Sequence, residues 1–290
     1  MGDASCRTRS SRLHGQTPRI IFSDRAAVRS SFGPLVKWIS SLSSKQEMRV
    51  RFLHGPPIFS VVSCVSKYHM SNLYGAFADH KGRPMLKWHH YFPVYEKHFS
   101  SWVNKPVTFL EMGVLHGGSL QMWRKYFGPL ATIIGIDINP ACKNYEEIGV
   151  NIRIGDQSDP VFLQSIIDEF GIPDIIIDDG SHISTHQKAS FEFWYHRMLK
   201  NGCYLIEDAH TSYWSDPFWK GGPDSIMEYS KNLVDRLNAD HTNDPDEFTR
   251  NTWCMSFYDS MIVFERGLIP LKGPCYAGSA PTGEPYHGTM

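Results

Sequence analysis

The sequence IIIDDGSHISTH at residues 175–186 joins an apolar run to side chains that can do chemistry. Three isoleucines are followed at once by Asp178 and Asp179, and His182 comes three residues after Asp179. A buried strand that ends in two carboxylates and an imidazole brings metal-binding groups and a proton acceptor to one place. We therefore expect a reactive site at the end of this strand.

Further acidic residues occur where they could join this site. The groups concerned are Glu207 and Asp208 in YLIEDAH (204–210), and His89, His90 and Glu96 in KWHHYFPVYEKHF (87–99). Carboxylates gathered at one site repel one another unless a cation neutralises their charge. A hard divalent cation takes oxygen ligands, and no cysteine motif offers sulfur, so Mg²⁺ or Mn²⁺ is favoured over Zn²⁺.

His182 is the residue of this set best suited to acid–base chemistry. Histidine titrates near neutral pH, so His182 could take a proton from a substrate hydroxyl as a general base. The alternative is a loop histidine that only makes a hydrogen bond to the backbone. The residues around it leave both interpretations open.

A second motif has the features of a nucleotide-binding turn. FLEMGVLHGGSLQMW (109–123) places Gly113, Gly117 and Gly118 between an apolar strand and a helix. Glycines there let the backbone approach a ligand and leave the N–H groups of the helix N-terminus free. Asp137 ends the next expected strand, 24 residues after Gly113, which is the spacing of a carboxylate that binds a ribose.

Two details favour S-adenosylmethionine over a dinucleotide as the ligand of this turn. The turn is G-x-x-x-G-G rather than G-x-G-x-x-G, and Glu111 precedes its first glycine. A carboxylate there would repel a pyrophosphate but attracts a ligand with ammonium and sulfonium groups. In GDQSD (155–159), Asp156 and Gln157 suit an adenine edge, whereas Asp159 is better placed to cap the next helix.

Short apolar runs and helical patterns alternate along the chain and would position these residues. We expect strands at 106–113, 132–138, 150–156, 173–180 and 202–210, and a hairpin at 253–266 that turns at Asp259–Ser260. We expect helices at 119–127, 160–171, 185–199 and 225–238, the last as a lid or a subunit contact. This pattern predicts an α/β fold with a doubly wound, mostly parallel seven-stranded sheet and an antiparallel C-terminal hairpin. Such sheets bind ligands at the carboxyl ends of their strands, where the acidic residues fall.

The bulk composition excludes some kinds of partner. The chain has 290 residues, a net charge of −1 and no basic surface that would attract nucleic acid. No apolar run approaches the roughly 20 residues of a membrane-spanning helix. Six scattered cysteines without a C-x-x-C motif are typical of free thiols in a reducing compartment, so we expect a cytoplasmic protein.

The two ends of the chain differ from the middle. Residues 1–60 contain ten lysines and arginines, three acidic residues and eleven serines. We interpret residues 1–65 as a basic, Ser- and Arg-rich extension, either disordered or, over residues 1–50, an organelle-targeting segment. Residues 66–270 are expected to form the folded domain, and residues 271–290 an irregular tail rich in proline and glycine.

The span from about residue 70 to 266 resembles the metal-dependent macrolide-sugar O-methyltransferases of the mycinamicin and tylosin pathways. The stretches that carry the resemblance are HHYFPVYEKHF, EMGVLHGGSLQMW, GIDI, GDQSD, IIIDDGSHISTHQKASF, YLIEDAHTSYW and FYDSMIVFER, in this order. The pair IDDGSH and IEDAHTSYW is far more specific than the glycine-rich turn. The resemblance implies that residues 66–270 are a Rossmann-like, class I S-adenosylmethionine-dependent methyltransferase domain.

The resemblance also implies roles for individual residues. Glu96, Asp179 and Asp208 would hold Mg²⁺ or Mn²⁺, and His182 would deprotonate the acceptor hydroxyl. The residues implied around S-adenosylmethionine are Glu111, Gly113, Gly117, Ser119, Asp137, Asp156, Gln157 and Asp178. The sequence does not decide whether Asp178 or Asp179 contacts the metal.

The implied acceptor is a small molecule or sugar with neighbouring hydroxyls, and the family habit implies a homo-oligomer. Where those enzymes carry a large N-terminal auxiliary domain this chain has residues 1–65, so the macrolide itself is not implied. Two alternatives stay open: a cephalosporin-hydroxylase-like or NAD-using enzyme on the same sheet, and a non-catalytic binding module with a methyltransferase fold. Glu111 and the missing G-x-G-x-x-G argue against NAD, and the intact acidic and imidazole residues argue against a non-catalytic module.

Overall fold

The computed structural model describes residues 72–242 and 244–267 of the chain. The interpretations of residues 1–65 as an extension and of 271–290 as a tail lie outside these residues. Within the described part, no helix combines the length and the apolar character needed to cross a membrane.

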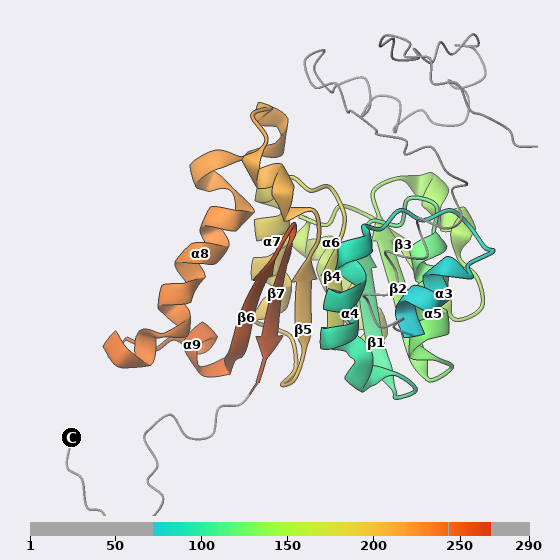
Figure 1. Ribbon diagram of the computed structural model, residues 1–290, viewed down its shortest axis with the longest axis horizontal. Helices are drawn as coiled ribbons and strands as arrows, with labels where there is room; N and C mark the ends of the chain where they lie inside the picture. Colours follow the sequence, from blue (N-terminus) through green and yellow to red (C-terminus); the bar gives the residue numbers. More distant parts are fainter. Residues whose placement is uncertain (1–71, 243, 268–290) are drawn as a thin grey trace, which may run out of the picture. The chain divides into compact units, whose positions relative to one another are not determined.

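A seven-stranded sheet forms the centre of this domain (Figure 1). Its strands are β1 Val107–Met112, β2 Ala131–Asp137, β3 Val150–Ile154, β4 Ile175–Asp178, β5 Cys203–Ile206, β6 Thr252–Tyr258 and β7 Met261–Arg266, and they lie in the order β3-β2-β1-β4-β5-β7-β6. Strands β1 to β5 are parallel, β7 is antiparallel to β5, and β6 is antiparallel to β7. The predicted fold class, including the C-terminal hairpin, is confirmed.

The central strands are apolar on both sides because helices cover both faces of the sheet. In β4, Ile175 and Ile177 pack into one core and Ile176 packs into the other, and all three are fully buried. In β1, Phe109 and Leu110 divide between the two cores in the same way. Unbroken runs of apolar, often β-branched residues are what a parallel strand covered on both faces requires.

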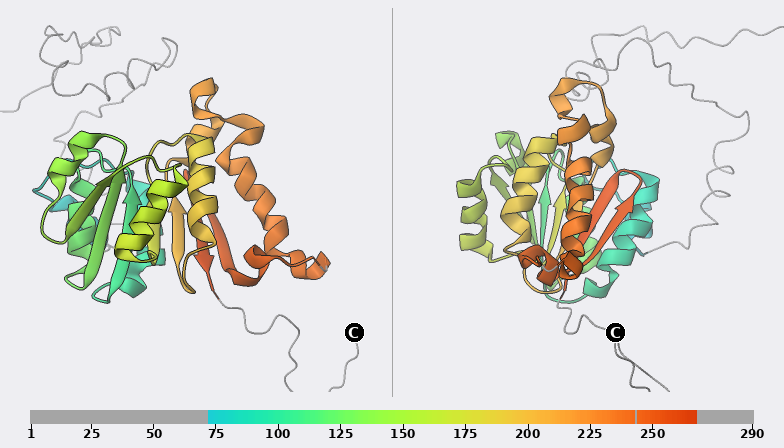
Figure 2. Two further views of the ribbon diagram at one scale, coloured as in Figure 1. Left: turned by 180° about the vertical axis from the view of Figure 1, so that it is seen from behind. Right: turned by 90° about the vertical axis from the view of Figure 1, so that its left-hand side faces the viewer.

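The helices form one layer on each face of the sheet (Figures 1 and 2). Helices α3 Asn72–Ala78, α4 Phe92–Phe99 and α5 Gly118–Phe127 cover one face, and α6 Pro160–Phe170, α7 Ser184–Tyr195, α8 Ile226–Leu237 and α9 Glu247–Asn251 cover the other. Short 3₁₀ turns occur at His89–Tyr91, Ser100–Trp102, Pro140–Tyr145, Ala209–Tyr213, Pro217–Trp219, Gly222–Asp224 and Ala239–Thr242. The first core contains Trp123 and Phe99, and the second contains Phe191 and Trp194.

The predicted strands and helices are confirmed, with boundaries shifted by a few residues. The strand expected at 202–210 is shorter because Asp208 leaves the extended conformation with a φ of 51°. Sequence patterns did not predict α3, α4 or α9, which are too short to show a helical period. Helix α8 buries Ile226, Met227 and Leu233 in the second core, so it belongs to the domain core rather than to a separate lid.

The strand order reverses between β1 and β4, and this point positions the site. The chain leaves β1 toward α5 on one face and leaves β4 toward α7 on the other. Met112 and Asp178 are paired at the ends of their strands, and the amide of Asp179 donates to the Met112 carbonyl at 3.0 Å. The turn after β1 and the acidic loop after β4 therefore start side by side, where sheets of this type bind ligands.

Gly113 allows this close approach of the two loops. Its φ is 95°, and a Cβ atom at this position would overlap the backbone of Asp179 and Gly180. Only glycine tolerates both the positive φ and the close approach of the other loop, because other residues are strained at positive φ and carry a Cβ atom.

We expect Gly113→Ala to lower the free energy of unfolding by more than Gly171→Ala does. Both glycines have positive φ, so each alanine costs about 1–3 kcal/mol of backbone strain. Only Gly113→Ala adds a steric overlap with the backbone, since nothing lies within 4 Å of the Cβ position of Gly171. Urea unfolding of both variants measures the difference, and equal losses would contradict the close packing of the two loops.

Candidate active site

A pocket of about 240 Å³ lies at the carboxyl ends of β1 and β4. Residues 84–87 form one wall, and Gly113, Gly118 and Ser119 of the turn after β1 form another. The remaining polar side chains that line it belong to His116, Asp137, Asp179, His182 and Asp208. The fold thus brings the glycine-rich turn and the acidic loops to one pocket, although they are far apart in the sequence.

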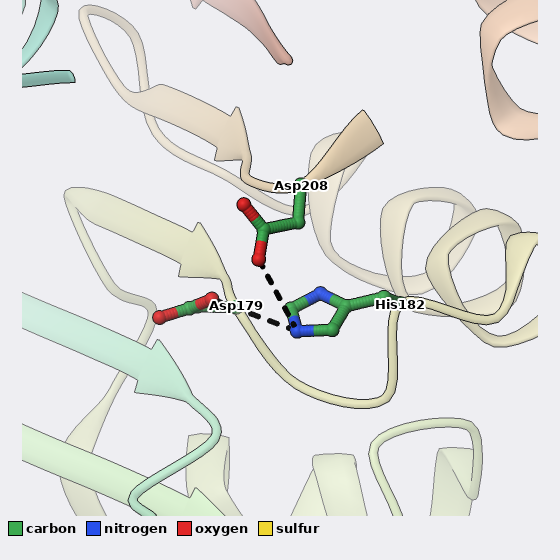
Figure 3. Close-up of side chains that lie close together, drawn as sticks. All are labelled: Asp179, His182 and Asp208. Atoms are coloured by element: carbon green, nitrogen blue, oxygen red, sulfur yellow. Dashed lines mark ion pairs between the residues drawn. The ribbon is translucent and has the colours of Figure 1, made fainter. Parts of the chain in front are cut away.

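Three side chains converge at this pocket and are called here the outer group: Asp179, His182 and Asp208 (Figure 3). Nε2 of His182 lies 3.9 Å from Oδ1 of Asp179 and 3.7 Å from Oδ2 of Asp208. One possible ligand atom of each residue lies within 4.8 Å of the other two, and Nδ1 of His182 is buried without a partner. Two carboxylates and an imidazole are a ligand set that accepts Mg²⁺ or Mn²⁺.

Two members of the outer group have an unfavourable backbone conformation. His182 and Asp208 have φ values of 55° and 51°, in the left-handed region that costs energy for residues other than glycine. The hydroxyl of Thr211 donates to the carbonyl of His182 at 3.0 Å, and the hydroxyl of Tyr91 donates to Oδ1 of Asp208 at 2.5 Å. Such strain, held in place by surrounding contacts, is concentrated at functional sites in proteins.

The structure separates the two adjacent aspartates that the sequence leaves equivalent. Asp178 ends β4 and is fully buried, and it accepts hydrogen bonds from Gln157 at 2.9 Å and from the hydroxyl of Tyr204 at 3.3 Å. Asp179 comes one residue later and lines the pocket. Asp179 is therefore the one that can contact a metal, while Asp178 supports the loop from inside.

Gln157 joins the loop after β3 to the loop after β4, Asp156 stabilises its own turn, and neither residue lines the pocket. The amide group of Gln157 donates to Asp178 and to Ser190 at 3.1 Å, and its oxygen accepts the backbone N–H of Ser181 at 2.7 Å. Asp156 accepts hydrogen bonds from the backbone and hydroxyl of Ser158, and these lower the pKa of Asp156. Asp159 caps α6 by accepting the N–H of Val161 at 2.9 Å, which confirms the cap expected from the sequence.

The residues expected around a methyl donor are only partly at the pocket surface. Gly113, Ser119 and Asp137 line it. The carboxylate of Asp137 also accepts the N–H groups of Val114 at 2.8 Å and Leu115 at 3.2 Å, which fixes the course of the turn. Gly117 precedes α5 with a φ of 73° and packs against Arg83, so it shapes the turn without lining the pocket.

Glu111 lies behind the pocket wall. Its carboxylate is fully buried and accepts hydrogen bonds from Ser119 at 2.6 Å, from Trp123 at 3.2 Å and from Lys87 at 3.1 Å. The expectation that Glu111 faces a donor directly does not match this position, because its oxygens are turned toward these three residues.

Lys87 is the functional candidate that the sequence analysis missed. Its ammonium group contacts Glu111, Asp179 at 2.6 Å and Glu207 at 3.0 Å, and its side chain is almost fully buried. Burial acts to lower the pKa of Lys87, but the carboxylates, Asp179 foremost, outweigh it and raise the pKa above its usual value. In the sequence, the many acidic residues at strand ends indicate that a cation must lie among them. They do not indicate that this cation is Lys87.

Burial also changes the acidity of the carboxylates. It raises the pKa of Asp179 to about 6, although Lys87 and His182 oppose the shift. Burial, together with the neighbouring Asp179, raises the pKa of Glu207 well above its usual value. Both groups favour a nearby positive charge, because a cation stabilises their ionised forms.

Glu96 is not brought to the outer group. It lies on α4 near Tyr126 of α5, where burial and the Glu96 carboxylate together raise the pKa of Tyr126. It belongs to neither of the two acidic groups of the described residues that are compact enough to bind a metal ion. The geometry corrects the expectation for Glu96, because α4 directs this side chain along α5 rather than to the strand ends.

Known proteins with similar sequences are sugar O-methyltransferases, and no protein-family model matches the chain. An 8-demethyl-8-alpha-L-rhamnosyl tetracenomycin-C 2'-O-methyltransferase of Streptomyces olivaceus is 38% identical over 165 residues, which cover 52% of this chain and 43% of that protein. The mycinamicin VI 2''-O-methyltransferase of Micromonospora griseorubida is 33% identical over 195 residues, or 62% of this chain and 48% of that protein. The chain thus spans about half the length of these relatives.

Solved structures agree with the sequence comparison. The methyltransferase MycE of the mycinamycin biosynthetic pathway, in complex with Mg and SAH, matches with a TM-score of 0.61 and 27% identity over 77% of this chain and 67% of that chain. Its complex with Mg, SAH and mycinamycin VI matches with a TM-score of 0.62 and 25% identity over 82% of this chain and 71% of that chain. The resemblance inferred from the sequence is confirmed.

We expect Gln157→Leu to lower the free energy of unfolding by about 1–3 kcal/mol, because it removes one hydrogen bond of the buried Asp178 carboxylate and the acceptor of the Ser181 N–H. Gln164→Leu is the matched control, since this exposed side chain on α6 makes a hydrogen bond to the exposed Asp168 and should change stability by less than about 0.5 kcal/mol. Chemical denaturation of both variants checks the difference. Equal stability of the two would show that Gln157 does not support the loop.

Proposed function

We propose that the protein is an S-adenosylmethionine-dependent, divalent-metal-assisted O-methyltransferase that acts on a hydroxyl of a sugar. One observation carries the proposal: the outer group and the glycine-rich turn line the same pocket. A methyl transfer to an oxygen needs both a donor and an activated hydroxyl within one enclosed space. The similarity to sugar O-methyltransferases supports this assignment.

The residues of the turn fit a methyl donor. Gly113 and Gly118 bring the backbone to the pocket wall without side chains, and Ser119 places a hydroxyl at the start of α5. Asp137 ends β2 on the pocket wall, at the position from which a carboxylate accepts the hydroxyls of a ribose. These contacts suit the ribose and amino-acid parts of S-adenosylmethionine.

The outer group fits Mg²⁺ or Mn²⁺. Asp179 and Asp208 supply hard carboxylate oxygens. Lys87 binds Oδ2 of Asp179 and Tyr91 binds Oδ1 of Asp208. The other oxygen of each carboxylate faces His182. We propose these two aspartates as the protein ligands. The metal would supply positive charge that makes a nearby hydroxyl more acidic, and the donor would supply an electrophilic methyl group.

His182 is proposed as the proton acceptor for the substrate hydroxyl. Its Nε2 faces Asp179 and Asp208, so the imidazole lies beside the two proposed metal ligands. The hydrogen bond from Thr211 to the His182 carbonyl holds the residue in this place.

Aromatic rings beside the outer group offer a surface for a sugar. Trp88 contacts His210, whose ring lies 5.2 Å from Trp214, and half of the Trp88 side chain is exposed. Sugar rings with apolar C–H faces pack on such rings while their hydroxyls point to polar groups. We propose this row as one wall of the acceptor site, with neighbouring hydroxyls of the sugar directed to the outer group.

Calorimetric titration with S-adenosylmethionine and with Mg²⁺ tests the proposal. We expect wild-type protein to bind both, and Asp208→Asn to bind the donor while its Mg²⁺ affinity falls by at least about 10-fold, since a ligand is lost. Asp235→Asn, an exposed position on α8, is the control and should bind both like wild type. Folded wild-type protein that binds no donor would overturn the assignment.

We expect His182→Ala to lower kcat by about 10²–10⁴ with little change in donor affinity, because it removes a general base. His241→Ala, at an exposed position, should leave kcat unchanged. The measurement is methyl transfer from labelled S-adenosylmethionine to a panel of glycosides with free neighbouring hydroxyls. Undiminished turnover of the His182 variant would exclude it as the base.

A further inference from the structure

The ammonium group of Lys87, which has no part in the proposed mechanism, lies at the centre of a cluster of three acids. Its Nζ is 3.1 Å from Glu111, 2.6 Å from Asp179 and 3.0 Å from Glu207. The side chain of Lys87 is 2% exposed, and those of Glu111 and Glu207 are 0% and 1% exposed. In the part of the chain that the structure describes, no other lysine or arginine pairs with these three acids.

The three acids, called here the inner group, come from the ends of three neighbouring strands. Glu111 lies in β1, Asp179 follows β4 and Glu207 follows β5. One oxygen of each lies within 4.8 Å of the others, which is close enough to bind one metal ion. Carboxylates at this spacing repel one another unless a cation lies between them, and here Lys87 supplies that charge.

Asp179 belongs to both the inner and the outer group. Its Oδ2 accepts a hydrogen bond from Lys87 at 2.6 Å, and its Oδ1 faces Nε2 of His182 at 3.9 Å. The ammonium therefore fixes one oxygen of this carboxylate. The other oxygen faces His182 (Figure 3).

We propose that Lys87 is a positioning residue whose ammonium group fills the inner group and thereby confines a divalent metal ion to the outer group. The confinement of the metal rests on the proposed function, whereas the filling of the inner group does not. The two groups share Asp179 and would otherwise present two adjoining places for a cation. Lys87 converts them into a site for a single ion.

The same ammonium group joins the metal-binding acids to the donor turn. Glu111 accepts a hydrogen bond from Lys87 through Oε1 and from Ser119 through Oε2 at 2.6 Å. Ser119 lines the pocket at the start of α5. The chain of contacts from Asp179 through Lys87 and Glu111 to Ser119 sets the two halves of the pocket at a fixed separation.

Two substitutions of Lys87 separate the effect of charge from that of space. Lys87→Ala removes the charge and opens room for an ion among the three acids. Lys87→Met removes the charge but keeps a side chain of similar length in that room. Lys231→Ala is the control, because this lysine pairs with Glu228 on the exposed side of α8, remote from the pocket.

The experiment counts Mn²⁺ ions bound per full-length chain by equilibrium dialysis and metal analysis. We expect Lys87→Ala to bind about one Mn²⁺ more than wild type, since the inner group then offers oxygen ligands to a hard cation. We expect Lys87→Met and Lys231→Ala to bind the same number as wild type. Equal counts for folded Lys87→Ala and wild type overturn the inference.

The number of bound Mn²⁺ ions also tests the proposed function and the role of Lys87 separately. Wild-type protein that binds no Mn²⁺ overturns the metal-dependent part of the proposed function. The difference between Lys87→Ala and wild type still decides the role of Lys87 in that case, because it does not depend on the wild-type number.

A second measurement uses wild-type protein alone, in case Lys87→Ala does not fold. Anomalous diffraction from crystals soaked in Mn²⁺ locates the bound ion. We expect the ion between Asp179 and Asp208, with the Lys87 ammonium group still in contact with the three acids of the inner group. An ion held by Glu111 and Glu207, with the Lys87 side chain displaced, overturns the inference.

Discussion

The contact of one buried ammonium group with three carboxylates is the interaction on which the rest of the site depends. Lys87 neutralises acids from the ends of β1, β4 and β5, which the parallel sheet brings together whatever their charge. Without a cation these groups would repel one another or take up protons, because burial removes the water that would screen them. The pocket above them then presents one carboxylate oxygen each of Asp179 and Asp208 toward His182.

The acidic loops are held in place from the side opposite to the pocket. Gln157 ties Asp178 to the backbone of the loop, and Tyr91 and Thr211 hold the two strained residues of the outer group. These supporting residues come from the 3₁₀ turn His89–Tyr91 before α4, from the loop after β3 and from the turn after β5. A site that must bind a doubly charged ion and orient a base gains rigidity from such contacts.

Much of the fold follows from the sequence because its signals are local. Runs such as III at 175–177 are apolar on consecutive positions, and this indicates a parallel strand covered on both faces. Helices α6 and α7 are long enough to show a period, and the Asp159 cap marks where α6 begins. Helices α3, α4 and α9 have five to eight residues and are stabilised by packing, so the sequence gives no periodic signal for them.

The sequence by itself determined which chemistry the chain can hold: carboxylates and a histidine after apolar strands, and glycines where a backbone must approach a ligand. Only the tertiary structure decided which of these groups meet. It turned Asp178 inward and Asp179 outward, placed Glu96 beside Tyr126, and inserted Lys87 among the acids. The physical reason is that contacts across the sheet edge depend on strand order and on the path of loops, and neither is encoded in local spacing.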